Sequence, residues 1–462
     1  TGFKSYDELY NWSIADIPAF WADMWEFGGI ITSRNYEHVV DDLSKMPGAR
    51  WFSGARLNFA ENLLSFRDDR TAIVFKGEGR ETVRITYAEL FERVARLAKA
   101  LRKAGVGADD RVAGFMPNLP ETVIAMLAST SLGAVWSSCS PDFGLRGVLD
   151  RFSQIQPKVL FTADGYLYGG KRFDSLERVR GIVAEIPGIE RVVVLPYLEK
   201  NPRLAGISRA ILWGDFISPE KAPPCDFVQL PAGHPLYVMY SSGTTGPPKC
   251  LVQGSAGILV NHLKELILHT DLKRDDTILY LTTCGWMMWN WLISSLAVGA
   301  TIVLYEGHPF HPGPDALWRL AEDEGITIFG ASARYLAALE KTGVRPGQEL
   351  GLASLRTILS TGSPLAVESF RYVYRDIKKD VQLASISGGT DLNGCFALGN
   401  PIAPVYSGEL QCRGLGMRVE VFNAAGQPVT GEPGELVCTA PFPSMPLRFW
   451  NDPDGRKYRK AY

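Results

Sequence analysis

Tyr240-Ser241-Ser242-Gly243-Thr244-Thr245-Gly246-Pro247-Pro248-Lys249 is the segment that carries most of the information in this sequence. It follows an apolar run at residues 235–239 that is typical of a short strand. Glycines let a turn approach a ligand closely, and free N–H groups and hydroxyls offer donors to phosphate oxygens. Lys249 adds a positive charge at the end of the segment. The order of these residues predicts a phosphate-binding loop. An ordinary surface loop is the alternative, because glycine, serine and threonine are common in loops.

The segment differs from the phosphate loop of the P-loop nucleotidases. Their pattern, G-x-x-x-x-G-K-[ST], places a lysine directly after the second glycine. Here Pro247 and Pro248 stand between Gly246 and Lys249, and Cys250 follows the lysine. The two prolines also oppose a helix that starts at this point. The sequence therefore disfavours a P-loop nucleotidase.

The composition is that of an ordinary globular protein. The 462 residues are enough for two or three units, on the usual scale of ~100–200 residues each. The formal charge of −2 gives no reason to expect nucleic acid or an anionic membrane as a partner. No stretch approaches the ~18 uninterrupted apolar residues of a membrane span. We expect no nucleic-acid partner and no integral membrane association.

The cysteines and the first residues bear on the cellular compartment. Seven cysteines are scattered without a C-x-x-C pair, which predicts reduced thiols and neither disulfides nor zinc ligands. Residues 1–7 lack the apolar core of a secretory signal. We therefore expect a cytoplasmic protein. None of the six histidines stands in a triad context, so structural roles are expected for them.

Strand-like and helix-like segments alternate along most of the chain. Apolar runs typical of buried strands occur at residues 72–75, 112–116, 159–161, 192–195, 278–281 and 301–304. Thr86 and Glu89 form a capping box that predicts the start of a helix. This alternation predicts an α/β fold with two helix-covered, mostly parallel sheets. Short β segments after residue 395 predict a small β unit.

Four parts are expected along the chain. They are an aromatic-rich N-terminal extension (1–65), a first α/β subdomain (66–235), a second α/β subdomain with the phosphate loop (236–394) and a small β subdomain (395–462). A proline-rich stretch at 219–235 marks the connection between the two α/β parts.

A second glycine-rich segment ends in an acid. Ser385-Ile386-Ser387-Gly388-Gly389-Thr390-Asp391 follows strand-like residues 381–384. A carboxylate just past a strand end is well placed to hold Mg²⁺ or a ribose. An Asx turn explains the same residues equally well.

Two further segments also follow apolar runs. Ser360-Thr361-Gly362-Ser363-Pro364, taken alone, is an ordinary turn. Cys284-Gly285-Trp286-Met287-Met288-Trp289-Asn290-Trp291 contains three tryptophans and two methionines, a composition found more often in a core than in a ligand pocket.

Together these segments resemble the signatures of the adenylate-forming enzymes, which include acyl-CoA synthetases, peptide-synthetase adenylation domains and luciferases. Residues 51–63 resemble the N-terminal signature of the acetyl-CoA synthetase-like members, so the resemblance runs over nearly the whole chain. It implies a ligase that uses ATP, Mg²⁺ and CoA. In such enzymes an acid and ATP give an acyl-adenylate and pyrophosphate, and CoA then displaces AMP.

The resemblance also implies roles for individual residues. Catalytic roles fall to Thr244, Lys249 and Asp391, and Asp391 also binds the Mg²⁺ on ATP. Nucleotide contacts fall to Ser241, Ser242, Gly243, Thr245, Gly246, Gly362, Ser363, Pro364, Ser385, Ile386, Ser387 and Thr390. The residues expected to line the acyl pocket are Trp286, Met287, Met288, Thr361 and Gly388. Trp289 and Trp291 are expected in the core.

This chain departs from the family pattern at three places. Asp391 replaces a glutamate, so the acid is one methylene shorter but keeps its charge. Ser363 replaces the glutamate of a Gly-Glu-Pro pattern that contacts adenine. Ser387 and Gly388 stand where acetyl-CoA synthetases place a bulky tryptophan that closes the acyl pocket. Loss of that indole is expected to leave space for acetate extended by an acetyl group, which is acetoacetate.

A buried keto oxygen needs a hydrogen-bond donor, and Ser387, Thr361 and Asn393 are all candidates. The expected reaction is therefore the ATP-dependent ligation of acetoacetate to CoA. Two alternatives stay open: ligation of another short acid, such as propionate, butyrate or 3-hydroxybutyrate, or a non-catalytic nucleotide-binding protein.

Family members carry a C-terminal lid after a hinge, with a lysine that contacts the reacting groups. The hinge and the Gly-Asp pair that precedes it are not found up to Tyr462. We therefore expect the lid to be absent from these 462 residues.

Overall fold

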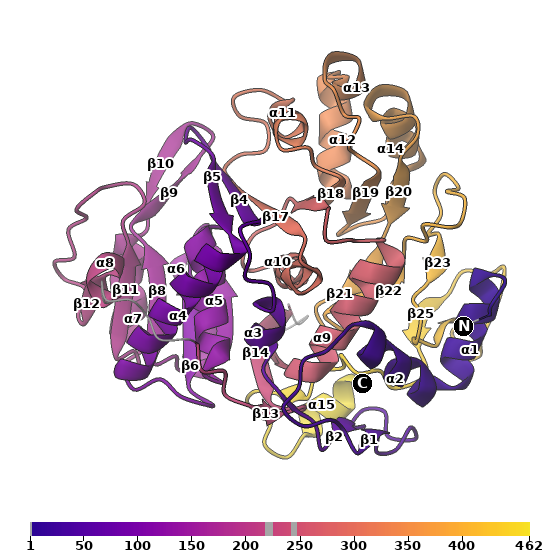
Figure 1. Cartoon of the computed structure of the whole chain (residues 1–462), viewed down its shortest axis with the longest axis horizontal. Helices are drawn as coiled ribbons and strands as arrows, with labels where there is room; N and C mark the ends of the chain where they lie inside the picture. Colours follow the sequence, from indigo (N-terminus) through magenta and orange to yellow (C-terminus); the bar gives the residue numbers. More distant parts are fainter. Residues whose placement is uncertain (1, 218–224, 242–246) are drawn as a thin grey trace.

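The computed structural model describes residues 2–217, 225–241 and 247–462. Two large sheets form its frame (Figure 1). In spatial order the first sheet consists of β12 (Ala210–Leu212), β11 (Arg191–Leu195), β8 (Val159–Ala163), β6 (Arg111–Phe115), β7 (Val135–Cys139), β14 (Pro235–Ser241), β15 (Lys249–Gly254) and β26 (Arg448–Phe449). The second consists of β20 (Gln382–Ser385), β19 (Thr357–Thr361), β18 (Ile328–Ser332), β16 (Thr277–Tyr280), β17 (Thr301–Glu306), β4 (Thr71–Gly77) and β5 (Val83–Thr86).

Most strand pairs in the two sheets are parallel. The antiparallel pairs among them are β14–β15, β15–β26 and β4–β5. Each apolar run that the sequence assigned to a buried strand overlaps one of these strands. The predicted α/β architecture with mostly parallel sheets is therefore confirmed.

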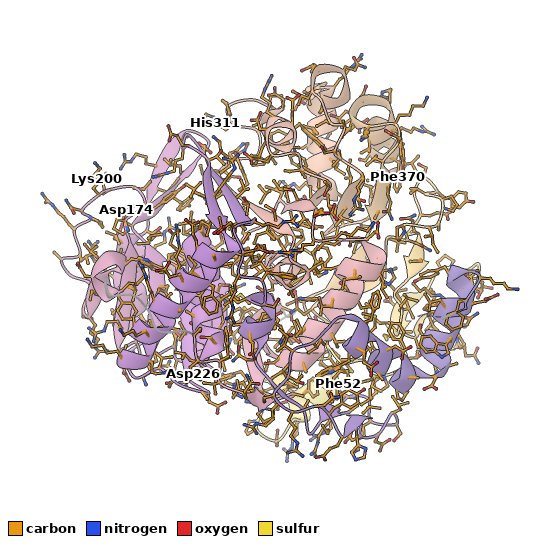
Figure 2. All side chains as sticks on the ribbon, in the orientation of Figure 1. Phe52, Asp174, Lys200, Asp226, His311 and Phe370 are labelled. Carbon is orange, nitrogen blue, oxygen red and sulfur yellow. The ribbon has the colours of Figure 1, made fainter. Side chains whose placement is uncertain are left out.

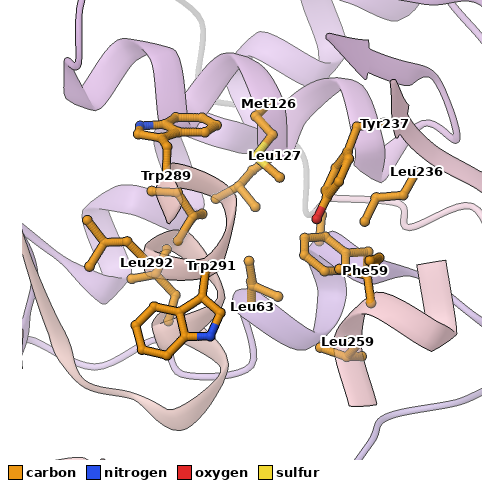
Figure 3. Packing of buried hydrophobic residues seen from close by; sticks show 14 of the residues in the cluster. Phe59, Leu63, Met126, Leu127, Leu236, Tyr237, Leu259, Trp289, Trp291 and Leu292 are labelled. Atoms are coloured by element: carbon orange, nitrogen blue, oxygen red, sulfur yellow. The ribbon is translucent and has the colours of Figure 1, made fainter. Parts of the chain in front are cut away.

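A shared core lies between the two sheets. It is filled by residues of α3 (Phe59–Leu63), α4 (Tyr87–Lys103), α5 (Pro120–Ser131), α9 (Ser255–Leu263) and α10 (Met287–Ile293). Figure 3 shows Phe59 and Leu63 of α3 in this core together with Trp291 of α10. The predicted capping box is present at the start of α4, where Thr86 and Glu89 each bond the other's backbone N–H.

Further helices cover the outer faces of the sheets. Residues of α6 (Leu145–Ile155) and α7 (Leu176–Glu185) pack on the first sheet, and residues of α11 (Ala316–Asp323), α12 (Ala333–Thr342) and α14 (Val367–Tyr372) pack on the second. Successive side chains of a strand point to opposite faces. On β11, for example, Val193 joins the central core while Val192 and Val194 join the outer one. Both faces are covered, as parallel sheets require.

The sheets draw strands from both sides of the expected subdomain boundary at residue 235. Strands β14 and β15 follow that boundary in the chain but belong to the first sheet. Strands β4 and β5 precede it but belong to the second. The division of the chain into four parts stays a prediction.

The N-terminal helices α1 (Tyr6–Ala15) and α2 (Ile17–Phe27) pack on the C-terminal β segments. The Tyr10 hydroxyl donates to the Met417 carbonyl at 3.1 Å, and the Gly416 N–H donates to Ser13 Oγ at 2.9 Å. These β segments form two small sheets, one of β21 (Ser387–Gly389), β22 (Gly394–Leu398) and β23 (Cys412–Arg413), the other of β24 (Val419–Phe422) and β25 (Glu435–Cys438). Figure 2 places Phe52 in the lower part of the view, far from Phe370 of α14.

The remaining helices and strands are short. They are β1 (His38–Val40), β2 (Trp51–Ser53), β3 (Arg56–Leu57), β9 (Gly165–Tyr168), β10 (Lys171–Asp174), α8 (Trp213–Phe216), β13 (Leu230–Pro231), α13 (Pro346–Glu349), α15 (Arg456–Ala461), the π-helices η1 (Lys264–His269) and η3 (Val373–Ile377), and the 3-10 helix η2 (Ser294–Val298). Among the described residues, no helix combines the length and the apolar character that a membrane crossing requires.

Candidate active site

The predicted phosphate loop joins two antiparallel strands. β14 ends at Ser241 and β15 begins at Lys249, and these two residues are partners across the pair. Five residues of the predicted loop lie outside the described residues, namely Ser242, Gly243, Thr244, Thr245 and Gly246. A strand, not a helix, follows the lysine, which agrees with the exclusion of a P-loop nucleotidase.

Lys249 lines a basic cavity of about 470 Å³. Its ammonium lies 5.7 Å from the centre of the Phe449 ring, a cation–π distance. Lys457 and Lys460 of α15 also line this cavity, and the described residues of its wall include no carboxylate. The end of the predicted loop thus borders a region of positive charge that suits phosphate groups.

Asp391 follows β21 in a turn that is fixed from two sides. The Tyr462 hydroxyl donates to Asp391 Oδ1 at 2.5 Å. Gln253 of β15 donates from Nε2 to the Thr390 carbonyl at 3.2 Å and lies 3.5 Å from the Asp391 carbonyl. Burial and the neighbouring Asp391 carboxylate raise the pKa of Tyr462 well above its usual value, so its hydroxyl keeps the proton that it donates.

Asn393 completes this turn in a left-handed conformation, with φ of 44°. Its carbonyl lies 2.9 Å from His262 Nε2, and its Nδ2 donates to the Tyr237 hydroxyl at 2.6 Å. Burial lowers the pKa of His262 to about 4, so the imidazole is neutral near pH 7. His262 and Asn393 therefore serve to hold the turn in place.

The turn after β19 lies next to the tryptophan segment. Gly362 has φ of 88°, in the left-handed region that favours glycine. A Cβ at Gly362 would lie 3.7 Å from the Trp286 ring and 3.9 Å from the Ser332 Cβ. The Thr361 hydroxyl donates to the Ile386 carbonyl at 2.8 Å. Three segments far apart in the sequence thus meet where the parallel strands β16, β19 and β20 end.

Trp286 lines a second cavity, of about 420 Å³. Asp142, Tyr168, Glu306 and Ser332 are also part of its wall. Burial raises the pKa of Glu306 to about 7, although the Asn118 N–H, 2.6 Å from Glu306 Oε2, opposes the shift.

The residues that follow Trp286 are more deeply buried. Met287 is 4 % exposed and Met288 1 %, and both belong to the central core. Trp289 and Trp291 are 0 % and 1 % exposed, which confirms the prediction that they are core residues. Their ring N–H groups donate to Asn118 and Glu265, each at 2.9 Å. Contact of Met287 and Met288 with an acyl group stays a prediction.

Gly388 lies in the strand pair of β21 and β22, which gives a reason for a glycine besides the expected space in the acyl pocket. It pairs with Cys395 in β22, and a Cβ at Gly388 would lie 2.1 Å from the Gly394 carbonyl oxygen. Glycine is needed here because two backbones approach closely. The expected widening of the acyl pocket stays a prediction. A contact between Gly388 and the acid stays a prediction.

Three residues of this region were not singled out from the sequence: Gln253, Glu306 and Tyr462. Gln253 interrupts an apolar strand, and it is fully buried at 0 % exposed. A polar residue within an apolar strand is a usable signal for a partner in the interior. Glu306 at the end of the strand-like run 301–304 gives a similar signal.

Comparison with known proteins identifies the family. The AMP-binding enzyme family matches residues 59–445, and the family of acetyl-coenzyme A synthetase N-termini matches residues 6–63. The chain is 51 % identical over 461 residues to acetoacetyl-coenzyme A synthetase of Rhizobium meliloti (strain 1021), with 100 % of this chain and 70 % of the relative covered. It is 42 % identical over 466 residues to malonamoyl-CoA synthetase of Penicillium aethiopicum, with 94 % and 64 % covered.

A solved structure agrees with this result. Acetoacetyl-CoA synthetase from Streptomyces lividans matches with a TM-score of 0.95 and 45 % identity, over 100 % of this chain and 71 % of that one. The similarity thus extends over the whole chain in both sequence and fold. The chain belongs to the AMP-binding enzyme family and, within it, to the AMP-forming ligases that join an acid to coenzyme A.

Proposed function

We propose that the chain catalyses the ATP-dependent ligation of acetoacetate to CoA through an acetoacetyl-adenylate, with release of AMP and pyrophosphate. Similarity to acetoacetyl-CoA synthetases over the full chain supports the substrate. One structural observation carries the assignment of the site. Gln253 on β15, the strand that begins at Lys249, bonds to the turn that carries Asp391.

The adenylation step brings two anions together. The carboxylate of acetoacetate attacks the α-phosphate of ATP, and pyrophosphate leaves. Preorganised donors and cations lower the electrostatic part of this barrier. We assign the donors to Ser241, Ser242, Gly243, Thr244, Thr245 and Gly246, with the charge of Lys249 beside them. No side-chain nucleophile is needed, because the substrate itself attacks.

Asp391 suits a Mg²⁺ that arrives on ATP. Mg²⁺ is usually held by one or two carboxylates together with substrate phosphates. Within the described residues no group of three or more His, Cys, Asp or Glu side chains could hold a metal ion alone. Over the same ranges, the hydrogen bond to the Asp391 carboxylate comes from Tyr462 through Oδ1, which leaves Oδ2 for the cation. Bound there, Mg²⁺ would neutralise charge on the leaving pyrophosphate.

The nucleotide itself is assigned to the ends of neighbouring parallel strands, where α/β proteins usually bind ligands. The residues are Gly362, Ser363 and Pro364 after β19, and Ser385, Ile386, Ser387 and Thr390 around the end of β20. Their proximity is supported by the bond from the Thr361 hydroxyl to the Ile386 carbonyl.

We assign the acyl group to Trp286, Met287, Met288, Thr361 and Gly388. Of the three candidate donors to the keto oxygen, Ser387 is favoured. Thr361 already donates to Ile386, and Asn393 is fully buried and donates to Tyr237. Ser387 is only half-buried, and its hydroxyl has no partner in the part of the chain that the structure describes. A site that bonds the keto oxygen would discriminate against acids that lack one.

The relative from Penicillium aethiopicum suggests a second acid. Malonamate carries an amide where acetoacetate carries a methyl ketone, so both place a carbonyl oxygen at the same distance from the carboxylate. Similarity to malonamoyl-CoA synthetase over most of the chain makes malonamate a reasonable competitor. A hydroxyl donor at Ser387 would serve either carbonyl.

The test is acid-dependent ATP–pyrophosphate exchange by the full-length protein that contains these 462 residues. The panel is acetoacetate, malonamate, acetate, propionate, butyrate and 3-hydroxybutyrate. We expect exchange to be fastest with acetoacetate. A faster reaction with another acid would keep the chemistry and replace the substrate. ATP binding without exchange for any acid would favour a non-catalytic nucleotide-binding protein.

A further inference from the structure

Tyr462 lies more than seventy residues from Asp391 in the sequence, yet its hydroxyl donates a hydrogen bond to the Asp391 carboxylate. A carboxylate on one methylene has two rotatable bonds and can turn either oxygen toward a cation. A hydrogen bond to one oxygen removes much of that freedom. Carboxylates that ligate metals are commonly held in this way by a neighbouring donor.

Tyr462 is 40 % exposed, and its ring packs against two other aromatic rings. Its centre lies 6.0 Å from that of Phe449 and 5.1 Å from that of Tyr458, both in edge-on contacts. Tyr458 is 6 % exposed, and its N–H donates to Asp452 Oδ2 at 2.8 Å. Edge-on aromatic contacts of this kind favour particular ring orientations. The hydroxyl therefore has a defined direction toward Asp391.

This aromatic cluster is also tied to the strand that begins at Lys249. Phe449 of β26 pairs with Leu251 of β15. Two residues further along β15, Gln253 bonds the Thr390 carbonyl. The Asp391 turn is thus contacted twice, through its backbone by Gln253 of β15 and through its side chain by Tyr462, whose ring contacts Phe449 of the neighbouring strand β26.

We propose that Tyr462 is a positioning residue, which orients the Asp391 carboxylate so that one oxygen is committed to the hydroxyl and the other is presented to the Mg²⁺ of ATP. The inference rests on the proposed function, since it assigns the metal to Asp391. Tyr462 does not touch the reacting atoms. Its effect is on the affinity and geometry of the metal.

The experiment compares Tyr462→Phe with Tyr458→Phe in the full-length protein. Both substitutions keep the ring and remove one hydroxyl from the same cluster, but the Tyr458 hydroxyl donates to the Pro446 carbonyl. Mn²⁺ binding is measured by electron paramagnetic resonance of the free ion, with α,β-methylene-ATP present and no acid, so that turnover is not needed. The Mg²⁺ dependence of ATP–pyrophosphate exchange with acetoacetate is measured beside it.

We expect Tyr462→Phe to raise the dissociation constant for Mn²⁺ about 10-fold, the size of effect seen when a partner of a metal ligand is removed. The Mg²⁺ concentration that gives half of the maximal exchange rate should rise by the same factor. The exchange rate should recover at saturating Mg²⁺. Tyr458→Phe should behave as wild type. An unchanged Mn²⁺ affinity in Tyr462→Phe, or the same shift in both variants, would overturn the proposal. Absence of exchange in the wild type contradicts the proposed function instead, and the Mn²⁺ titration still decides the role of Tyr462.

Discussion

Gln253 and Thr390 are joined by a hydrogen bond of 3.2 Å from the side-chain amide to a main-chain carbonyl, although 137 residues separate them. The bond connects the strand after the predicted phosphate loop with the turn that carries Asp391. Gln253 is fully buried, and its Oε1 has no partner among the described residues. The amide is therefore retained at some cost, since a buried polar atom without a partner is unfavourable.

This bond leads to the first prediction. Gln253→Leu removes the contact with Thr390 and also the unpartnered oxygen, so the free energy of unfolding should change by no more than about 1 kcal/mol. Because the Asp391 turn loses a support, the rate of ATP–pyrophosphate exchange should fall about 10-fold. Exchange and thermal unfolding would be measured together, with exposed Gln427→Leu as the control. A large loss of stability with normal exchange would assign Gln253 to the core alone.

The second prediction concerns the charge of Asp391. Asp391→Asn keeps the shape of the side chain and removes the charge that we assign to the metal, so exchange should fall about 100-fold or more. Asp391→Glu keeps the charge but lengthens the side chain toward Tyr462. It should retain more exchange activity than the Asp391→Asn variant. Exchange at several Mg²⁺ concentrations would be compared with that of Asp380→Asn, an exposed control. Equal activity in the Asn and Glu variants would argue against a metal-binding role.

The third prediction tests the donor to the keto oxygen. Ser387→Ala should cost about 1 kcal/mol with acetoacetate, which is roughly fivefold in kcat/KM. Butyrate has no keto oxygen, so its kcat/KM should not change, and the ratio between the two acids should fall by the same factor. Ser354→Ala, at an exposed position, is the matched control. If both acids lose activity equally, Ser387 acts on the nucleotide side of the site or on the β21–β22 pair instead.

Parts of this site could be predicted because parallel strands end at a common edge. Gly362, Trp286 and Ile386 each follow an apolar run, and the sheet order brings those runs together. Tyr462 could not be placed from the sequence, since its contact with Asp391 depends on how β26 and α15 pack on β15. The close backbone contact at Gly388 could not be predicted either, because it depends on the pairing of β21 with β22. Local patterns thus predicted strands and turns, whereas contacts between distant segments required the fold.

The fourth prediction concerns the pH dependence of stability through Glu306. Burial raises its pKa in the folded chain to about 7, above the ordinary value of 4.5 that applies to the unfolded chain, and the neighbouring Asp142 and Glu78 carboxylates add to the shift. Between these two values the folded state binds more protons than the unfolded state. The contribution of Glu306 to the free energy of unfolding is therefore fully present below pH 4.5 and is lost as the pH rises through about 7.

The free energy of unfolding that is lost in this way amounts to at most about 3 kcal/mol. Glu306→Gln should remove this dependence, so that the variant gains stability relative to wild type as the pH rises from 5 to 8. The measurement is the free energy of unfolding by urea across this pH range. Glu81→Gln, at an exposed position, controls for the loss of a surface charge and should keep the wild-type slope. A constant difference between Glu306→Gln and wild type at all pH values would mean that Glu306 does not titrate in this range.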